Sequence, residues 1–322
     1  MDLSQVFLAN RSINNLLPRK EEGCFFEYIA NSELSGRREE EMDTSIQTIE
    51  QLKLYAKELR KRILTTAHYK KQGHVGGSLS CADILVTLYY HQLTIDVSNP
   101  QWEDRDRFVL SKGYTALGLY AVLSLKGFIS TEELRTFDQF GSRLQAHPDM
   151  TKLEALDMST GSLGQGLSVA VGMAIGAKRL KKDFCVYCLI GDGESQEGQI
   201  WEAANIAHKY KLDNLIVVLD NNALQQYGWK QEKGRKPPEY RGKSKFDSFG
   251  FETWEIDGHS FANLIEVFSE AKRNRDGRPK AIIANTVKGK GVSFMENNYL
   301  WHSRAPNDEE YHIAISELEV RV

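Results

Sequence analysis

The sequence of 322 residues predicts an α/β protein with a doubly wound, mostly parallel sheet and helices on both faces. Two runs, Val186–Ile190 and Leu215–Leu219, are almost continuously apolar, as is typical of parallel strands that are covered on both sides. The helical segment Glu197–Tyr210 lies between them. The same order recurs later, with a strand at Thr253–Ile256, a helix at Phe261–Arg273 and a strand at Ala281–Asn285. Alternation of strands and helices indicates a parallel sheet.

The first half of the chain adds elements of the same kinds. Apolar residues recur at helical spacing from Ile46, and this helix is expected to stop near Gln72-Gly73. The following elements are expected to be a helix at Ala82–Tyr90 capped by Ser80, a strand at Phe108–Leu110, a helix at Tyr114–Leu125 ended by Gly127, and a helix within Gly161–Leu180. The last of these is rich in small residues between Ser168 and Ala177, which would let another backbone approach closely.

Composition divides the chain into residues 1–45, an appended arm, and residues 46–322, one domain. The arm is polar and lacks sustained periodicity, with a short helix expected around Ser4–Leu16. It could be a solvated tail or a docking segment for a partner, and its role stays open. The basic segment Lys230–Lys245 is expected to be a surface loop.

Charge and composition exclude several classes of protein. The chain has 41 basic and 44 acidic side chains, a net charge of −3, which argues against nucleic-acid binding as its main task. No apolar stretch is long enough for a transmembrane helix, and the N-terminus is a poor secretory signal. Four cysteines do not make a disulfide scaffold, and Cys185 and Cys188 would lie on opposite faces of a strand. We therefore expect a cytoplasmic protein with no nucleic-acid or membrane partner.

The most informative stretch lies between Cys188 and Gly228. Gly191-Asp192-Gly193 follows one apolar strand, and Asp220-Asn221-Asn222 ends the next strand. Ligands of parallel α/β sheets bind outside the carboxyl ends of the strands, and consecutive strands are often neighbours. A carboxylate, an amide oxygen and a main-chain carbonyl suit Mg²⁺ or Ca²⁺, with phosphate oxygens completing the coordination. These strand ends therefore predict a metal site that also binds a phosphorylated ligand.

This stretch resembles the thiamine diphosphate signature, and its flanks resemble transketolase. The resemblance runs from about Ile46 to Ile315 and includes the motifs QGHVGGSLSCADIL, RDRFVLSKGYTALGLYAVL, GSRLQAHPDM, STGSLGQGLSVAVGMAIGAKRL, EIDGH, ANTVKGKGVSFMEN and WHSRAP. Common transketolases are about twice as long and carry three domains. This chain ends where the first, the diphosphate-binding domain, ends. It therefore resembles the N-terminal subunit of a split transketolase.

The resemblance implies roles for individual residues. Asp192, Asn222 and the carbonyl of Leu224 match metal ligands. The residues matching cofactor contacts are Gly161, Ser162, Leu163, Gly191, Gly193, Tyr114, Gln226 and His302. The residues matching catalytic positions are His74, His147 and His302, which line the family's substrate channel, and Glu197, a buried glutamate at the family's subunit interface. His259, in Asp257-Gly258-His259, is interpreted as a turn element.

Two positions depart from the family pattern. Tyr114 stands in Ser111-Lys112-Gly113-Tyr114, where family members usually have histidine. A tyrosine can donate one hydrogen bond but cannot become an imidazolium. Gln226 replaces part of a pattern that commonly carries an apolar residue and Asp before the glycine. Both changes are compatible with cofactor binding and argue against the usual sugar-phosphate substrate, so the donor and acceptor stay open.

The function that the resemblance implies is transfer of a two-carbon ketol unit from a donor ketone to an acceptor aldehyde. Thiamine diphosphate and Mg²⁺ (or Ca²⁺) would be the cofactors. A second subunit with the pyrimidine-binding domain would be required, in a heterotetramer. The alternatives are a transketolase-like carboligase of secondary metabolism, the α subunit of an enzyme that decarboxylates 2-oxoacids, and a non-catalytic assembly partner. Asp192 and Asn222 argue against the last.

Overall fold

The structure, a computed structural model, describes the backbone of residues 22–226 and 241–320, and side chains from residue 46 onward within those ranges. The expected helix at Ser4–Leu16 and most of the Lys230–Lys245 loop lie outside the described residues. The chain divides into two compact units, residues 1–48 and 49–322. We keep the boundary between residues 45 and 46 as a prediction.

Helix α1 (Glu22–Lys70) begins well before the start expected at Ile46. Between residues 31 and 45 the sequence carries charged and polar residues without a sustained apolar period, so apolar spacing cannot locate the start of this helix. The end at Lys70 agrees with the expected stop at Gln72-Gly73, within the usual uncertainty of helix ends.

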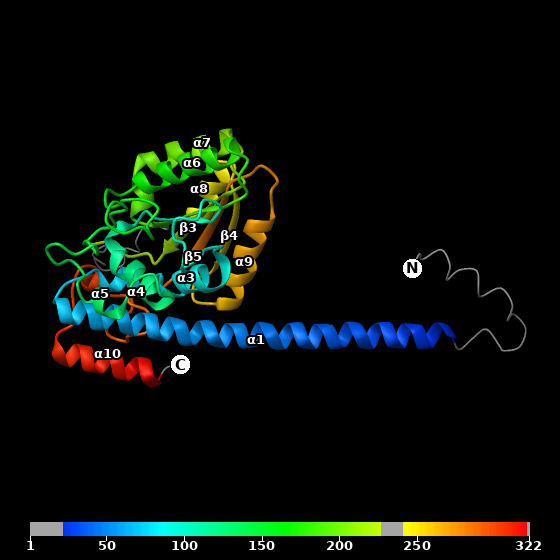
Figure 1. The fold of residues 1–322 in the computed structure, drawn as a ribbon, viewed down its shortest axis with the longest axis horizontal. Coiled ribbons are helices and arrows are strands. Elements are labelled where there is room, and N and C mark those ends of the chain that lie inside the picture. The colour runs from blue at the N-terminus through cyan, green and yellow to red at the C-terminus, as the bar shows by residue number, and fades with distance from the viewer. Residues whose placement is uncertain (1–21, 227–240, 321–322) are drawn as a thin grey trace, which may run out of the picture. The chain divides into compact units, whose positions relative to one another are not determined.

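Within the described residues, five parallel strands form one sheet in the order β1-β2-β3-β5-β4. Figure 1 labels β3, β5 and β4 of this sheet. The strands are β1 (Arg107–Leu110), β2 (Val186–Gly191), β3 (Leu215–Asn221), β4 (Glu252–Asp257) and β5 (Lys280–Asn285). All five overlap the strands expected from the sequence, and the predicted fold class is confirmed. In the register of β2 and β3, Gly191 lies opposite Asp220, so these two strands end side by side.

The other elements connect and cover the strands. They are α2 (Val75–Ser80), α3 (Ala82–Thr87), α4 (Ala116–Lys126), α5 (Thr131–Leu134), α6 (Gln165–Arg179), α7 (Gly198–Lys209), α8 (Gly242–Ser248), α9 (Phe261–Arg273), α10 (Asp308–Val320), the π-helix η2 (Leu88–Gln92) and the 3₁₀ helices η3 (Gly113–Thr115), η4 (Glu194–Gln196) and η5 (Tyr299–Trp301). Gly127 ends α4 in the left-handed conformation, with φ 99°, as expected.

Helix α2 was not expected, and it changes the role assigned to Ser80. Its glycines disfavour a helix, but Gly76 is held by packing, because an added Cβ would lie 2.8 Å from the Trp301 carbonyl oxygen. Ser80 is the last residue of α2, and Cys81 precedes α3. The expectation that Ser80 caps the next helix was therefore wrong. Its hydroxyl instead donates to Asp220 Oδ2 at 2.6 Å.

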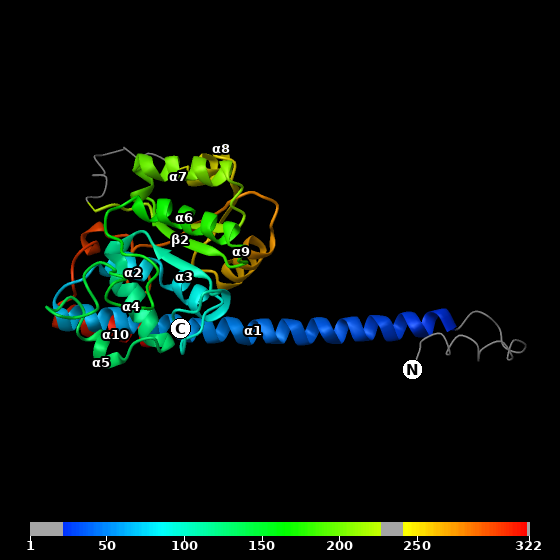
Figure 2. The ribbon, with the colours of Figure 1, turned by 45° about the horizontal axis from the view of Figure 1, so that its top comes forward.

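Helices cover both faces of the sheet. One face packs against α6, α7 and α8, and the other packs against α3 and α9 (Figure 2). Cys185 belongs to one apolar core and Cys188 to the other, so the two side chains lie on opposite faces as the strand periodicity predicted. Both are buried free thiols. No helix within residues 22–226 or 241–320 combines the length and apolarity that crossing a bilayer requires.

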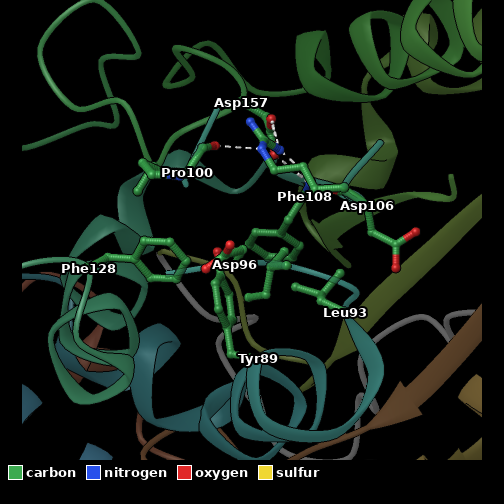
Figure 3. Close-up of a pocket in the computed structure, with 11 residues that line it drawn as sticks. Tyr89, Leu93, Asp96, Pro100, Asp106, Phe108, Phe128 and Asp157 are labelled. Carbon is green, nitrogen blue, oxygen red and sulfur yellow. Dashed lines mark hydrogen bonds and ion pairs between the residues drawn. The ribbon is translucent and has the colours of Figure 1, made fainter. Parts of the chain in front are cut away.

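A small cavity lies between β1 and η2, where Tyr89 and Phe108 line it together with Asp157 (Figure 3). Asp157 pairs there with Arg105, at 2.6 Å between Oδ1 and Nη1. The cavity volume is about 20 Å³, which is room for a water molecule and too little for a substrate. We treat it as a packing feature of the core.

Candidate active site

The carboxyl ends of β2 and β3 form the floor of the candidate site. The Asp192 N–H donates to the Asp220 carbonyl oxygen at 3.3 Å, and Asn222 follows β3 by one residue. The crossover through α7 has therefore brought the two polar strand ends together, as their spacing predicted. A parallel sheet binds its ligands at this edge.

A cavity of about 540 Å³ opens above these strand ends. Nine of the residues expected at the site line it: His74, Tyr114, Gly161, Leu163, Asp192, Gly193, Leu224, Gln226 and His302. Glu194 and Gln225 also line it and were not predicted. Segments that are far apart in the sequence thus contribute to one cavity, which is large enough for a cofactor.

The other expected residues lie around this cavity. Gly191 ends β2. Asn222 is buried and is not among the residues that line the cavity. Ser162 is exposed. His147 is also exposed and lies against Gly161, where an added Cβ would be 3.1 Å from its ring. Glu197 precedes α7 and is exposed, although the family position is buried at an interface. Its role therefore stays a prediction that depends on a second chain.

The oxygens of the predicted metal ligands match a hard divalent cation. Asn222 turns its amide nitrogen toward Asp220 Oδ2, at 3.3 Å, while its Oδ1 accepts from the Leu224 N–H at 3.1 Å. Burial, and then the nearby Asp220 carboxylate, raise the pKa of Asp192 to about 6. A carboxylate in such a place gains from a cation beside it. The donor set of carboxylate, amide and carbonyl oxygens fits Mg²⁺ or Ca²⁺.

The backbone segments at Gly113 and Gly161 approach each other closely beside the cavity. A Cβ on Gly113 would lie 2.7 Å from both the Gly161 nitrogen and Thr160 Oγ1, so only glycine fits there. Gly161 has φ +148°, a conformation that other residues rarely adopt. Thr160 Oγ1 is buried without a hydrogen-bond partner among the described residues. Beside the cavity there are therefore backbone atoms that no side chain covers, and the Thr160 hydroxyl oxygen, which has no hydrogen-bond partner among the described residues.

Three aromatic side chains that line the cavity lie close to one another. The ring centroids of His74 and His302 are 5.3 Å apart, and Tyr114 lies 5.5 Å from the first and 5.1 Å from the second. Burial, followed by the positive fields of His147 and Lys288, lowers the pKa of His74 to about 4. Burial and Lys288 lower the pKa of His302 to about 3. Both imidazoles are therefore neutral at pH 7.

Lys288 is a site residue that the sequence reasoning did not single out. Its side chain is only 1% exposed, and Nζ donates to the Leu224 carbonyl oxygen at 2.9 Å and lies 3.0 Å from His302 Nδ1. Burial, then Lys112, lower its pKa to about 8. Lys288 lies in the quoted ANTVKGKG motif, directly after β5. A lysine that follows a buried strand at the ligand-binding edge was the signal that could have identified it.

Glu194 also went unpredicted, although it joins three loops of the site. Its Oε1 accepts from the Ser111 hydroxyl and from the Gly164 N–H at 2.8 Å, and its Oε2 accepts from the Gly191 N–H at 3.2 Å. The side chain is 2% exposed. A buried carboxylate with three donors holds the strand end beside the start of α6, and so fixes the shape of the cavity.

Comparison with known proteins agrees with this geometry. Residues 53–318 match the family model described as "Transketolase, thiamine diphosphate binding domain". The chain belongs to the transketolase family. The matched region covers most of the chain and includes the whole sheet and the cavity. The resemblance found in the sequence is therefore confirmed, and the matched domain is one that binds thiamine diphosphate.

Relatives of similar length are named as transketolase subunits. The chain is 44% identical to a 6-deoxy-6-sulfo-D-fructose transketolase subunit of Clostridium sp. (strain MSTE9), over 77% of this chain and 88% of that protein. It is 39% identical to an apulose-4-phosphate transketolase subunit of Phocaeicola vulgatus, over 85% of this chain and 96% of that protein.

Longer transketolases match over only part of their length. The crystal structure of transketolase from Campylobacter jejuni superposes with a TM-score of 0.75 and 32% identity, over 85% of this chain and 43% of that chain. Human transketolase is 38% identical, over 80% of this chain and 40% of its own length. The chain thus spans about two fifths of these longer transketolases and corresponds to their thiamine diphosphate-binding part.

Proposed function

We propose that the chain is the diphosphate-binding subunit of a two-chain transketolase, which moves a two-carbon ketol unit from a donor ketone to an acceptor aldehyde. The observation that supports this most directly is the shared cavity. Asp192, Leu224, His74 and His302 all line it. Ligands for a metal–diphosphate pair therefore lie beside proton-transfer groups within one space.

Within this proposal, Asp192, Asn222 and Leu224 hold Mg²⁺, or Ca²⁺, beside the cofactor's diphosphate. The electrostatics support it, since the pKa of the Asp192 carboxyl is raised while the pKa values of Lys288 and two histidines are lowered. A cation beside the carboxylate and an anion beside the other three would reverse these shifts. Gly161, Ser162, Leu163, Gly191, Gly193, Tyr114 and Gln226 are the further positions assigned to cofactor contact.

Thiamine diphosphate supplies an electron sink for carbon–carbon bond cleavage and formation when it is bound. The protein's own task is to orient the substrate and move protons at its oxygens. His74 and His302 are suited to this because they are neutral at pH 7 and close to each other. A diphosphate's negative charge would raise both pKa values toward neutrality, where proton transfer is most effective. His147, beside Gly161, would serve at the rim.

The second chain is proposed to carry the pyrimidine-binding domain and its glutamate. Glu197 and the outer face of α6 are the surfaces assigned to that contact. Glu197 is exposed, and a Cβ added to Gly172 or Gly176 would meet nothing within 4 Å. Ala170 and Ala174 of the same helix are already buried in this chain's own core. We propose a heterotetramer with two copies of each chain, located in the cytoplasm.

Assays on the isolated chain and on the pair test the proposal. The chain purified alone should show no ketol transfer, and the chain co-purified with its partner should show it in the presence of thiamine diphosphate and Mg²⁺. The substrate panel should include ketose phosphates and 6-deoxy-6-sulfofructose, the substrate named for one relative. Turnover by the isolated chain at a rate comparable to that of the pair would overturn the two-chain proposal.

Product analysis separates the alternatives. Release of CO₂ from a 2-oxoacid would point to a decarboxylating enzyme, and a new carbon–carbon product without sugar phosphates would point to a carboligase of secondary metabolism. Tyr114, which lies beside both His74 and His302, is the observation that favours a specialised substrate. Failure of the assembled pair to bind thiamine diphosphate in calorimetry would indicate a non-catalytic partner.

A further inference from the structure

The loop that carries Lys288 follows β5 and contacts two residues that line the cavity. Lys288 touches the Leu224 carbonyl oxygen on one side and His302 on the other, at 2.9 and 3.0 Å from Nζ. Gly289 N–H in the same loop donates to the Gly76 carbonyl oxygen at 3.0 Å. A small displacement of this loop would therefore change two contacts of Lys288 together. One is with the carbonyl oxygen of Leu224, a proposed metal ligand, and the other is with His302 Nδ1.

A chain of buried polar contacts begins and ends on this loop. The Val287 N–H donates to His259 Nε2 at 2.9 Å. Because Nε2 accepts, the proton of this imidazole is on Nδ1, which donates to Asp83 Oδ2 at 2.7 Å. Arg60 then makes two hydrogen bonds to the Asp83 carboxylate, at 2.8 and 2.7 Å. Finally, Arg60 Nε donates to the Lys290 carbonyl oxygen at 3.1 Å.

These hydrogen bonds hold the loop at a residue before Lys288 and at a residue after it. Val287 precedes the lysine and Lys290 follows it by two residues, and both are held by the same three side chains, Arg60, Asp83 and His259. The three come from α1, α3 and the turn after β4, so elements on one face of the sheet are joined to the loop. Asp83 is 5% exposed and Arg60 is 7% exposed.

Stability alone is a weak reason for such an arrangement. A buried ion pair often stabilises a fold no better than apolar residues of the same size, because both charges lose their water. What it does provide is a fixed geometry. His259 has one ring nitrogen on the loop and the other on Asp83, so it can occupy only one orientation and one tautomer.

We propose that Asp83 and His259 are positioning residues, which act through Val287 to hold Lys288 against Leu224 and His302. This inference rests on the proposed function, because it assigns the loop to the cofactor-binding cavity. It adds to that function a set of residues that touch neither the cofactor nor the substrate. Arg60 completes the set by fixing Asp83 and the far side of the loop.

The first test uses a matched pair of variants at His259. In His259→Asn the shorter amide can still donate to Asp83 but cannot reach the Val287 N–H. In His259→Gln the longer amide oxygen can accept from Val287. The reactivity of each lysine toward acetic anhydride is measured by mass spectrometry on the full chain without cofactor. Lys288 should become at least about tenfold more reactive in His259→Asn and return toward the wild-type value in His259→Gln.

Buried lysines elsewhere separate a local effect from general loosening. Lys112 and Lys280 have fully buried side chains and should keep their wild-type reactivity in both variants. Asp157→Asn is a second control, because it breaks a buried ion pair with Arg105 that is remote in sequence from the loop. It should leave the reactivity of Lys288 unchanged.

The second test is the affinity for thiamine diphosphate with Mg²⁺, measured by calorimetry on the co-purified assembly. His259→Asn should weaken binding about tenfold, as losses of orienting residues at metal sites commonly do, and His259→Gln should restore most of it. Unchanged Lys288 reactivity in His259→Asn, or an affinity within about threefold of wild type, would overturn the inference. If the wild-type assembly binds no cofactor, the proposed function fails and the reactivity measurement alone decides the inference.

Discussion

The ammonium group of Lys112 lies against the carboxylate of Asp220, and both side chains are completely buried. Asp220 also accepts hydrogen bonds from the hydroxyls of Ser80 and Thr286 and from the amide nitrogen of Asn222. The pair is therefore the centre of a network beneath the cavity. By holding the amide nitrogen of Asn222, it fixes the direction of the amide oxygen, which we propose as a metal ligand.

The first prediction is that Lys112→Met destabilises the chain by about 3–5 kcal/mol. Removing the lysine leaves a buried carboxylate without its partner, which costs far more than losing an exposed ion pair. Lys243→Met is the control, because Lys243 pairs with Asp247 at the surface and should change stability by less than about 1 kcal/mol. Urea unfolding of the full chain measures both. A loss below about 1 kcal/mol for Lys112→Met would contradict the prediction.

The second prediction concerns pH and Asp83. Burial alone would raise the pKa of Asp83, but Arg60 and the hydrogen bond from His259 hold it well below its ordinary value. Because the folded pKa is depressed, this carboxylate stabilises the fold above pH 4, and that contribution is lost as the pH falls below about 4. Asp83→Asn should therefore lower the free energy of unfolding more at pH 7 than at pH 3. An equal loss at both values in urea unfolding would be evidence against the depressed pKa.

The third prediction is that Asp192→Ala abolishes metal-dependent binding of thiamine diphosphate without unfolding the chain. The carboxylate directly follows β2 and lines the cavity, so a ligand in the cavity can reach it. Calorimetry on the assembled enzyme measures the affinity, and circular dichroism checks the fold. Asp183→Ala, at a fully exposed side chain, is the control. Affinity within about threefold of wild type for Asp192→Ala would contradict the metal assignment.

The sheet and its ligand-binding edge could be predicted because their signals are local. A parallel strand covered on both faces is a run of apolar residues, and the polar residues that follow it lie at one edge of the sheet. Asp192 and Asn222 could be found in this way. The start of α1 could not, since the mostly polar residues 31–45 interrupt any apolar period along this helix.

The missed site residues depend on partners that are distant in the sequence. Lys112 and Asp220 are 108 positions apart, and each alone looks like an ordinary surface charge. Lys288 reaches Leu224 across 64 positions. Nothing in a short segment shows that such a charge is buried. Glu197 has the opposite difficulty, because its expected environment belongs to a second chain.

The last prediction concerns Tyr114, whose ring lies beside those of His74 and His302. Gly77 makes room for this ring, because an added Cβ would be 3.0 Å from Tyr114 Cε2. Burial raises the pKa of the Tyr114 hydroxyl, so the phenol stays neutral and can only donate or accept a hydrogen bond at physiological pH. A histidine in its place would be smaller and could carry charge.

Tyr114→His should therefore raise kcat/KM for ordinary ketose phosphates, or lower it for the enzyme's own best substrate, by about tenfold in either case. Tyr114→Phe separates the two causes, since it keeps the ring and removes the hydroxyl. A loss in both variants would assign the effect to the hydrogen bond, and a change in Tyr114→His alone would assign it to size and charge. The kinetics are measured on the co-purified pair with both substrate sets. If Tyr114→His leaves both unchanged, the residue fills space beside His74 and His302 and does not select the substrate.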